Sequence, residues 1–318
     1  MRVLVTGGGG FIGSHITHRL VQSGHDVRVL DNFSTGRREN LAAIADHVEV
    51  REGDIQSYER VQAAAKGAEI IFHQAALPSV LRSVEDPLSS NASNVIGTLN
   101  VLLAARDCEA RRLIFASSSS VYGKNHSLPK REDAVQMPIS PYAVSKLAGE
   151  GYCRSFTEVY GIETVTLRYF NVFGPRQDPL SEYAAVIPRF ITTVLAGRVP
   201  TIYGDGEQSR DFTYVDNAVE ANMLAMSAEG VAGSAYNVAC GRQISLKELI
   251  ASLREVTGRG IEPIFDDARA GDVKHSYADV SRTEADLGYR PVVSFCEGLK
   301  RTVEWYEHEQ HEVDVFLN

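Results

Sequence analysis

The sequence lacks the features that would place it outside the ordinary globular proteins. It has four cysteines in 318 residues, and no two of them lie within four positions, which excludes a zinc or redox spacing and a disulfide scaffold. No apolar run approaches the roughly 20 residues that span a bilayer, and the run before the first glycines is too short for a signal peptide. Lysine and arginine total 32 against 41 aspartates and glutamates, a net charge of −9, which argues against nucleic-acid binding. We therefore expect a soluble, cytoplasmic protein that binds neither nucleic acid nor membrane.

The composition and the hydrophobic pattern indicate an α/β protein. Hydrophobic residues make up 44% and charged residues 23% of the chain, as in folded domains. In the first half, short apolar runs alternate with stretches of helical spacing. The runs predict strands at residues 3–5, 27–30, 48–50, 70–73, 113–116 and 164–168. The intervening stretches predict helices at residues 13–23, 57–66, 95–107 and 143–160. This alternation predicts a doubly wound parallel sheet.

After Arg168 the pattern becomes more irregular, and four prolines fall between residues 175 and 200. The elements expected there are helices at residues 186–196 and 246–256, a further segment at 283–287, and strands at 201–203 and 211–215. The length suits two domains, or one domain with a smaller lobe. We expect a smaller lobe that is partly interleaved with the first domain.

Three glycines follow the first predicted strand. Gly7, Gly10 and Gly13 have the spacing GxxGxxG, which lets the backbone turn tightly and approach a pyrophosphate at the start of a helix. By themselves they could form only a flexible turn. Asp31 ends the second strand, 21 residues after Gly10, where an acidic residue binds an adenosine ribose and repels a 2′-phosphate. The pattern therefore predicts a cofactor site for NAD rather than NADP.

Polar and small residues follow two more strands. Asp54 and Ile55 follow the third strand, and Gln74, Ala75 and Ala76 follow the fourth. Ligands of a doubly wound sheet lie at the carboxyl ends of its strands. We expect Asp54 to reach the adenine amine and the two small alanines to let the backbone approach the cofactor.

Tyr142 and Lys146 are four residues apart, so a helix brings both to one face. A free tyrosine has a pKa near 10, and a nearby ammonium, helped by the positive charge of oxidised nicotinamide, favours the phenolate. The pair can then remove a proton from a sugar hydroxyl. A serine run at residues 117–120 follows the fifth strand, where a hydroxyl can bridge the substrate to Tyr142 or merely cap a turn.

In these motifs and their spacing the chain resembles the extended short-chain dehydrogenase/reductase family from residue 1 to about residue 300. The matching positions include Asn94, the run SSSSVYG, Tyr169 to Asn171, and Arg210 with Asp211. The stretches PYAVSK, LRYFNVFGPRQDP, YAAVIPRF and GDVKHSYAD resemble the nucleotide-sugar 4-epimerases, above all those acting on UDP-N-acetylglucosamine and UDP-glucose.

This resemblance implies a retained NAD and the 4-epimerisation of UDP-hexoses through a transient 4-keto sugar. It also implies a homodimer formed through a bundle of the helices at residues 95–107 and 143–160. The expected domains are a Rossmann NAD-binding domain at 1–171 and 211–238, and a nucleotide-sugar-binding lobe at 172–210 and 239–318.

The resemblance also assigns site residues, and no metal site is expected. Tyr142 acts as the base, Lys146 anchors the nicotinamide ribose, and Ser118, with Ser119 as second candidate, binds the reacting oxygen. The cofactor-binding positions are Gly7, Gly10, Phe11, Ile12, Gly13, Asp31, Asn32, Ser34, Thr35, Gly36, Asp54, Ile55, Gln74, Ala75, Ala76, Asn94, Ser117, Tyr142, Lys146 and Tyr169. The substrate-binding positions are Ser79, Val80, Ser118, Tyr142, Asn171, Ala185, Val186, Tyr203, Arg210, Arg269, Asp272 and Ser276.

Several alternatives remain beside this interpretation. A 4,6-dehydratase carries an Asp-Glu pair where this chain has Ser119 and Ser120, and a decarboxylase carries a glutamate there. A reductase usually needs NADP. A non-catalytic NAD sensor typically loses the tyrosine or the lysine of the pair. A UDP-glucuronate 4-epimerase stays open. Arg210 and Arg269 bind the diphosphate or pair with Asp211 and Asp272. The small Ser276 predicts that N-acetylated sugars fit, unless its side chain points away.

Overall fold

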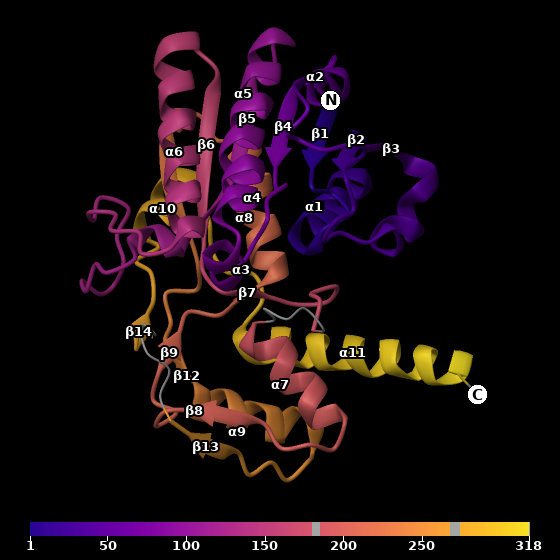
Figure 1. Ribbon diagram of the computed structural model, residues 1–318, viewed down its shortest axis with the longest axis vertical. Helices are drawn as coiled ribbons and strands as arrows, with labels where there is room; N and C mark the ends of the chain where they lie inside the picture. Colours follow the sequence, from indigo (N-terminus) through magenta and orange to yellow (C-terminus); the bar gives the residue numbers. More distant parts are fainter. Residues whose placement is uncertain (180–184, 268–273, 318) are drawn as a thin grey trace.

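The computed structural model describes residues 1–179, 185–267 and 274–317. Its upper part is a seven-stranded sheet in the order β11-β6-β5-β4-β1-β2-β3, and each neighbouring pair is parallel (Figure 1). These strands are β1 (Arg2–Thr6), β2 (Asp26–Asp31), β3 (Val48–Glu52), β4 (Ile70–His73), β5 (Arg112–Ser118), β6 (Glu163–Tyr169) and β11 (Ser234–Val238). The strand order reverses between β1 and β4, as in a doubly wound sheet, which confirms the predicted fold class.

Helices cover both faces of this sheet. They are α1 (Phe11–Gln22), α2 (Tyr58–Ala65), α3 (Val80–Glu85), α4 (Pro87–Asn91), α5 (Gly97–Asp107), α6 (Pro141–Tyr160), α8 (Val215–Ser227) and α10 (Ser281–Leu287), with 3-10 helices η1 (Arg38–His47) and η3 (Ser119–Tyr122) and a π turn η2 (Ala92–Ile96). On β1, Val3 and Val5 pack into the core beneath α1 and α8, whereas Leu4 packs into the core beneath α2, α5 and α6. This alternation follows from the two-residue period of a strand.

The lower lobe has its own core (Figure 1). Its elements are β7 (Val172–Phe173), α7 (Val186–Leu195), β8 (Thr201–Tyr203), β9 (Ser209–Arg210), β10 (Thr213–Tyr214), β12 (Ile244–Ser245), α9 (Leu246–Thr257), β13 (Ile264–Asp266), β14 (His275–Ser276) and α11 (Phe295–Leu317). The Phe173 ring lies 5.7 Å from Tyr214 and 5.8 Å from Phe295 between ring centroids, and Phe212 stacks on Phe295 at 5.8 Å. Helix α11 starts in this cluster and extends away from the lobe (Figure 1).

The structure corrects the sequence expectations around residue 211. A strand was expected over residues 211–215, but only Thr213 and Tyr214 are extended, and α8 begins at Val215. The reason is Asp211, whose buried carboxylate accepts hydrogen bonds from the backbone N–H groups of Cys240 at 2.8 Å and Gly241 at 2.9 Å. The aspartate thus anchors a loop instead of continuing a strand. Helices α8 and α11 and strand β11 were not expected.

No helix within the described part of the chain is long and apolar enough to cross a membrane.

Candidate active site

The glycine turn after β1 leaves no room for side chains. Gly7 has a φ of +71°, and a Cβ atom there would lie 2.6 Å from the backbone N of Ala75. A Cβ atom on Gly13 would lie 2.0 Å from the Gly7 carbonyl oxygen. Glycine is therefore required at both positions, because the turn and the first residues of α1 touch each other and the end of β4.

The start of α1 forms the floor of a cleft. Gly10 is the N-cap residue, no side chain caps the helix, and its first turn carries no acidic residue. The unsatisfied N–H groups and the helix dipole therefore favour an anion at this end. Residues at the carboxyl ends of β1, β2, β4 and β5 line this cleft, among them Gly7, Asp31, Gln74 and Ser117. These features fit a dinucleotide whose pyrophosphate lies on the helix start.

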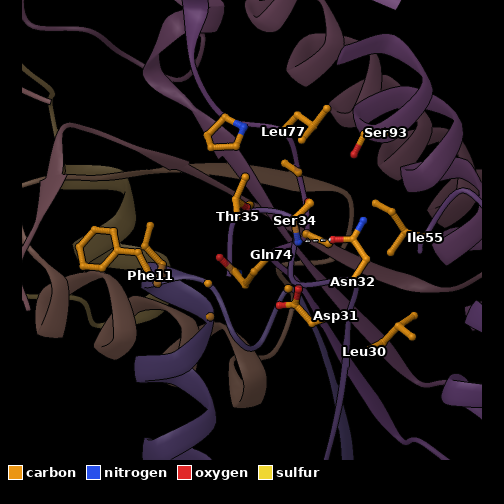
Figure 2. Close-up of a pocket in the computed structure, with 18 of the residues that line it drawn as sticks. Phe11, Leu30, Asp31, Asn32, Ser34, Thr35, Ile55, Gln74, Leu77 and Ser93 are labelled. Carbon is orange, nitrogen blue, oxygen red and sulfur yellow. Dashed lines mark hydrogen bonds between the residues drawn. The ribbon is translucent and has the colours of Figure 1, made fainter. Parts of the chain in front are cut away.

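Asp31 is held at the second strand end by the glycine turn. The N–H of Gly9 donates to Oδ2 and the N–H of Phe33 to Oδ1, both at 2.8 Å. Burial raises the pKa of Asp31, and these hydrogen bonds oppose the shift. In Figure 2 Asp31 lies near Asn32, whose Oδ1 accepts a hydrogen bond from the Ser34 N–H at 3.0 Å. The carboxylate therefore lines the cleft in a fixed orientation.

All predicted cofactor positions except Gly36 and Asn94 line this cleft. Gly36 instead packs on the glycine turn, where a Cβ atom would lie 2.8 Å from the Gly9 carbonyl carbon. Asn94 is buried, and its amide pairs with the backbone of Leu77, accepting at 2.7 Å and donating at 3.1 Å. It also donates to the Ser145 hydroxyl at 3.1 Å. Asn94 therefore positions the loop after β4 and joins it to α6.

Sequence reasoning missed some residues of the cleft. These are Leu30, Gly53, Leu77, Pro78, Ser93 and Ala116. Most of them lie one or two positions from a predicted residue at a strand end. A prediction that included the neighbours of each such residue would have found them. Ser93 belongs to the π turn before α5 and precedes the predicted Asn94, so the same extension to neighbours would have included it.

Tyr142 and Lys146 lie at the start of α6. The Ser140 hydroxyl caps this helix by accepting from the Ala143 N–H at 3.1 Å, and Pro141 occupies its first turn. The Lys146 Nζ donates to the Ala116 carbonyl at 2.8 Å and lies 5.9 Å from the centroid of the Tyr142 ring. The expected one-turn spacing thus brings both side chains into the cleft, at the carboxyl end of β5.

Burial governs the ionisation of this pair. It raises the pKa of Tyr142, and a hydrogen bond with the Ser118 side chain opposes the shift. Burial also lowers the pKa of Lys146 to about 8. Lys146 is not among the groups that shift the Tyr142 pKa in this structure, so its effect on the phenol stays a prediction. Ser119 lies half-buried in η3, one position beyond Ser118.

A second pocket lies in the lobe next to the cleft. Of the predicted substrate residues, Asn171, Ala185, Val186, Tyr203 and Arg210 line it. Asn171 lies two positions after Tyr169, which lines the cofactor cleft, so the two sites adjoin. The residues not predicted are mainly apolar: Val172, Phe173, Ile187, Arg189, Phe190, Thr201, Gln208, Phe212 and Leu246.

The remaining predicted substrate residues lie outside this lining. Ser276 pairs with Arg210 in the parallel ladder of β14 and β9, so it adjoins a residue of the pocket wall. Ser79 has a φ of 96° and caps α3, accepting from the Arg82 N–H at 3.3 Å, and Val80 is the first residue of that helix. Arg269 and Asp272 lie outside the described residues.

Within the ranges that the structure describes, no group of three or more His, Cys, Asp or Glu side chains could hold a metal ion.

The glycine turn, the acidic end of β2 and the tyrosine-lysine pair define a dinucleotide-dependent enzyme built on a doubly wound sheet.

The comparisons with known proteins identify the family. The model of the NAD dependent epimerase/dehydratase family matches residues 3–239, and the chain belongs to that family. This confirms the resemblance and the expected NAD cofactor. The UDP-glucose 4-epimerase of Mycolicibacterium smegmatis is 40% identical over 313 residues, which cover 97% of this chain and 99% of that protein.

Solved structures of two epimerases are similar over almost the whole chain. The UDP-N-acetylglucosamine 4-epimerase of Methanobrevibacter ruminantium, in complex with UDP-N-acetylmuramic acid, has a TM-score of 0.93 and 41% identity, covering 97% of this chain and 98% of that one. The UDP-glucose 4-epimerase of Thermotoga maritima, with UDP-glucose, has a TM-score of 0.93 and 38% identity, covering 98% and 100%.

Proposed function

We propose that this chain is an NAD-dependent isomerase that inverts carbon 4 of UDP-hexoses. One observation carries the proposal: Tyr142, which Ser118 hydrogen-bonds, lines the cofactor cleft together with Lys146. The lobe pocket begins two positions after Tyr169 of that cleft, at Asn171. A sugar bound in the lobe would therefore present its ring to the tyrosine. The similar epimerases named above, which act on UDP-glucose or UDP-N-acetylglucosamine, support this substrate class.

The proposed mechanism needs one base. Tyr142 removes the proton of the 4-hydroxyl and later returns it, and Ser118 hydrogen-bonds the same oxygen. When bound, NAD supplies a hydride acceptor and donor, so that carbon 4 becomes a transient ketone and is then reduced on its opposite face. Lys146, fixed by the Ala116 carbonyl, holds the nicotinamide ribose and places a positive charge beside the phenol. The buried setting strengthens that charge interaction, because the local dielectric is low.

In the lobe we propose that Arg210 binds the diphosphate. Its Nη1 donates to the carbonyls of Ser209 at 2.9 Å and Lys274 at 3.3 Å, which fixes the guanidinium at the pocket wall. A guanidinium can make charge-assisted hydrogen bonds to phosphate oxygens. Arg269, Asp272 and Asn171 complete the proposed contacts to the nucleotide and the inner phosphate or sugar.

We further propose that N-acetylated UDP-hexoses are accepted together with non-acetylated ones. Ser276 adjoins Arg210, which lines the lobe pocket, and a small side chain at that position would leave room for an N-acetyl group. Glucuronate remains the alternative substrate.

A homodimer is also proposed, formed by the helices on the α5 and α6 side of the sheet. Large apolar side chains are exposed there: Val80, Leu81, Val84, Leu88, Ile96, Val144 and Tyr152. Light scattering of the purified protein tests this assembly, and Leu88→Glu should shift it toward monomer. We propose a cytoplasmic location, with which four free cysteines agree. We propose the predicted domain division with two changes, since Tyr214 of β10 packs in the core of the lobe and Leu287 of α10 packs in the core of the sheet domain.

The activity is tested with UDP-glucose, UDP-N-acetylglucosamine and UDP-glucuronate, each carrying deuterium at carbon 4. We expect the 4-epimer of at least one sugar, without added NAD, and with deuterium retained at carbon 4. Loss of deuterium to solvent, or a dehydrated or decarboxylated product, would contradict a 4-epimerase. Turnover of glucuronate alone would favour the alternative substrate.

A further inference from the structure

A buried ion pair lies behind the tyrosine-lysine pair. Arg168 of β6 holds Glu150 of α6 by two hydrogen bonds, Nε to Oε1 at 2.9 Å and Nη2 to Oε2 at 2.7 Å. Their side chains are only 2% and 6% exposed. A buried carboxylate of this kind needs every partner it has, because an uncompensated charge in the interior is costly.

Glu150 also contacts the strand that ends at the active site. The Ser117 hydroxyl donates to its Oε1 at 2.5 Å. The neighbouring residues of β5 contact the same helix, since Ala116 accepts from Lys146 and Ser118 hydrogen-bonds Tyr142.

Three consecutive residues of β5 therefore meet three α6 residues spaced four apart, at positions 142, 146 and 150. Residues four apart lie on one face of a helix, so these contacts fix the rotation and the height of α6 against the strand. The first two of the three helix positions are the proposed base and the proposed cofactor anchor. The third, Glu150, has no part in the mechanism above.

The charge of Glu150 acts on Lys146. Burial lowers the pKa of Lys146 to about 8, and Cys153 and, to a smaller extent, Glu150 oppose that shift. The other titratable groups that face the ammonium are Tyr142 and Cys153 on α6 and His73 on β4. Burial raises the pKa of Tyr142 and the pKa of Cys153 and lowers the pKa of His73 to about 3, so these three groups are uncharged at neutral pH.

We propose that Glu150 is a positioning residue of the reaction: it holds Ser117 and α6 in place and keeps the ammonium of Lys146 charged. This inference rests on the proposed roles of Tyr142 and Lys146. It assigns to the Glu150–Arg168 pair a task beyond filling the interior, because the carboxylate binds Arg168 directly and its charge also acts on Lys146.

The test separates that task from simple stabilisation. Glu150→Gln alone leaves Arg168 buried without its partner, so the informative protein is the double variant Glu150→Gln with Arg168→Met, which removes both charges. We expect it to retain NAD and its KM within about twofold, while kcat near pH 8 falls about fivefold. The reason is that Glu150, and not Arg168, is among the groups that act on the pKa of Lys146. The alkaline limb of the kcat profile should move to lower pH, so the loss should be much smaller near pH 6.

Glu150→Asp is the conservative companion and also serves if the double variant does not fold. It keeps the carboxylate charge, but its shorter side chain lies farther from Ser117. We therefore expect a lower kcat, with the alkaline limb of the kcat profile near its wild-type position. The inference would be overturned if the folded double variant had the kcat profile of the wild type, or if its kcat fell by the same factor at every pH. It would also be overturned if the alkaline limb moved as far in Glu150→Asp as in the double variant.

Lys146→Met separates this inference from the function on which it rests. If Lys146→Met turns over normally, the proposed site itself is wrong. If Lys146→Met is inactive and the double variant matches the wild type, only the role of Glu150 is wrong.

Discussion

The cofactor cleft and the lobe pocket are built in different ways. The cleft is shaped by backbone, with glycines at Gly7 and Gly13 where any Cβ atom would collide with a neighbouring chain segment. The lobe pocket is shaped by side chains from β7, α7, β8, β9 and the start of α9. A pocket wall made of backbone tolerates few substitutions, whereas in a wall made of side chains each substitution changes the volume of the pocket. From this comparison we predict that the cleft carries the chemistry and that the lobe selects the substrate.

The two regions also differ in how their polar groups are held. In the cleft, Asp31 and Lys146 are each fixed by a backbone partner from a strand end or the glycine turn. In the lobe, Asp211 ties together segments far apart in the chain by accepting from the N–H groups of Cys240 and Ala278, at 2.8 and 3.2 Å. Substitutions in the cleft should therefore change kcat for every substrate, and substitutions in the lobe should change KM or selectivity.

Tyr142→Phe is the strongest test of the cleft. The variant keeps the ring that packs beside Lys146 but has no proton to exchange, so we expect kcat to fall about 10³-fold or more for every sugar. Steady-state kinetics, together with NAD released on denaturation, measure turnover and cofactor content separately. Tyr160→Phe on the same helix, at an exposed position, is the control. Near-normal turnover by Tyr142→Phe would remove the tyrosine from the reaction.

Arg210→Ala tests the lobe in the same way. A charge-assisted hydrogen bond contributes a few kcal/mol at most, so we expect KM to rise about 10- to 100-fold while kcat changes little. Initial rates over a range of UDP-sugar concentrations give both constants. Lys247→Ala removes an equal charge from an ion pair with Glu207 in the same lobe and should leave KM unchanged. An unchanged KM in Arg210→Ala would indicate that the arginine has only a structural role.

The cleft could be predicted from the sequence because its signals are local. A strand followed by GxxGxxG, with an acidic residue at the end of the next strand, specifies the cofactor turn. This signal does not depend on the rest of the chain. The structure still changed the role of two predicted residues. Gly36 packs on the glycine turn, and Asn94 pairs with Leu77 and Ser145 instead of lining the cleft. Neighbours far apart in the sequence decide which way such a side chain points.

The lobe was predicted less completely, for a physical reason. Phe190 and Phe212 line its pocket, but in a sequence they cannot be distinguished from core residues, and both are buried. Strand β11 was missed because its run SAYNV mixes polar and apolar residues. That edge strand pairs with β6 alone in the sheet, so it carries a weaker apolar pattern than a central strand.

Ser276→Tyr sharpens the comparison within the lobe. If Ser276 borders the sugar, the larger ring should fill the space needed by an N-acetyl group and lower kcat/KM for UDP-N-acetylglucosamine about 10- to 100-fold relative to UDP-glucose. Competition between the two sugars in one reaction gives this ratio directly. Ser281→Tyr, at an exposed helix start, is the control for size. A ratio unchanged in Ser276→Tyr would place the wall elsewhere.

Acid should lower the stability of the sheet domain through His73, and we expect this effect to be the smallest of the four predicted effects. His73 is fully buried between the hydroxyls of Thr6 at 2.8 Å and Thr98 at 2.9 Å, and burial lowers its pKa from 6.5 to about 3. Between these values the unfolded chain binds a proton that the folded chain does not, so the free energy of unfolding falls as pH falls below 6.5. The loss should reach about 2 kcal/mol by pH 5.

His73→Gln removes this titration while keeping a side chain that hydrogen-bonds. We expect a protein that is less stable at neutral pH but loses less stability on going to about pH 5, as measured by urea unfolding at both pH values. His126→Gln, in an exposed loop, should keep the wild-type difference. The lobe contributes in the opposite direction, because burial raises the pKa of Asp211 to about 6 and protonation near that pH then favours the folded state. If His73→Gln loses as much stability in acid as the wild type, the buried histidine is not what makes the sheet domain sensitive to acid.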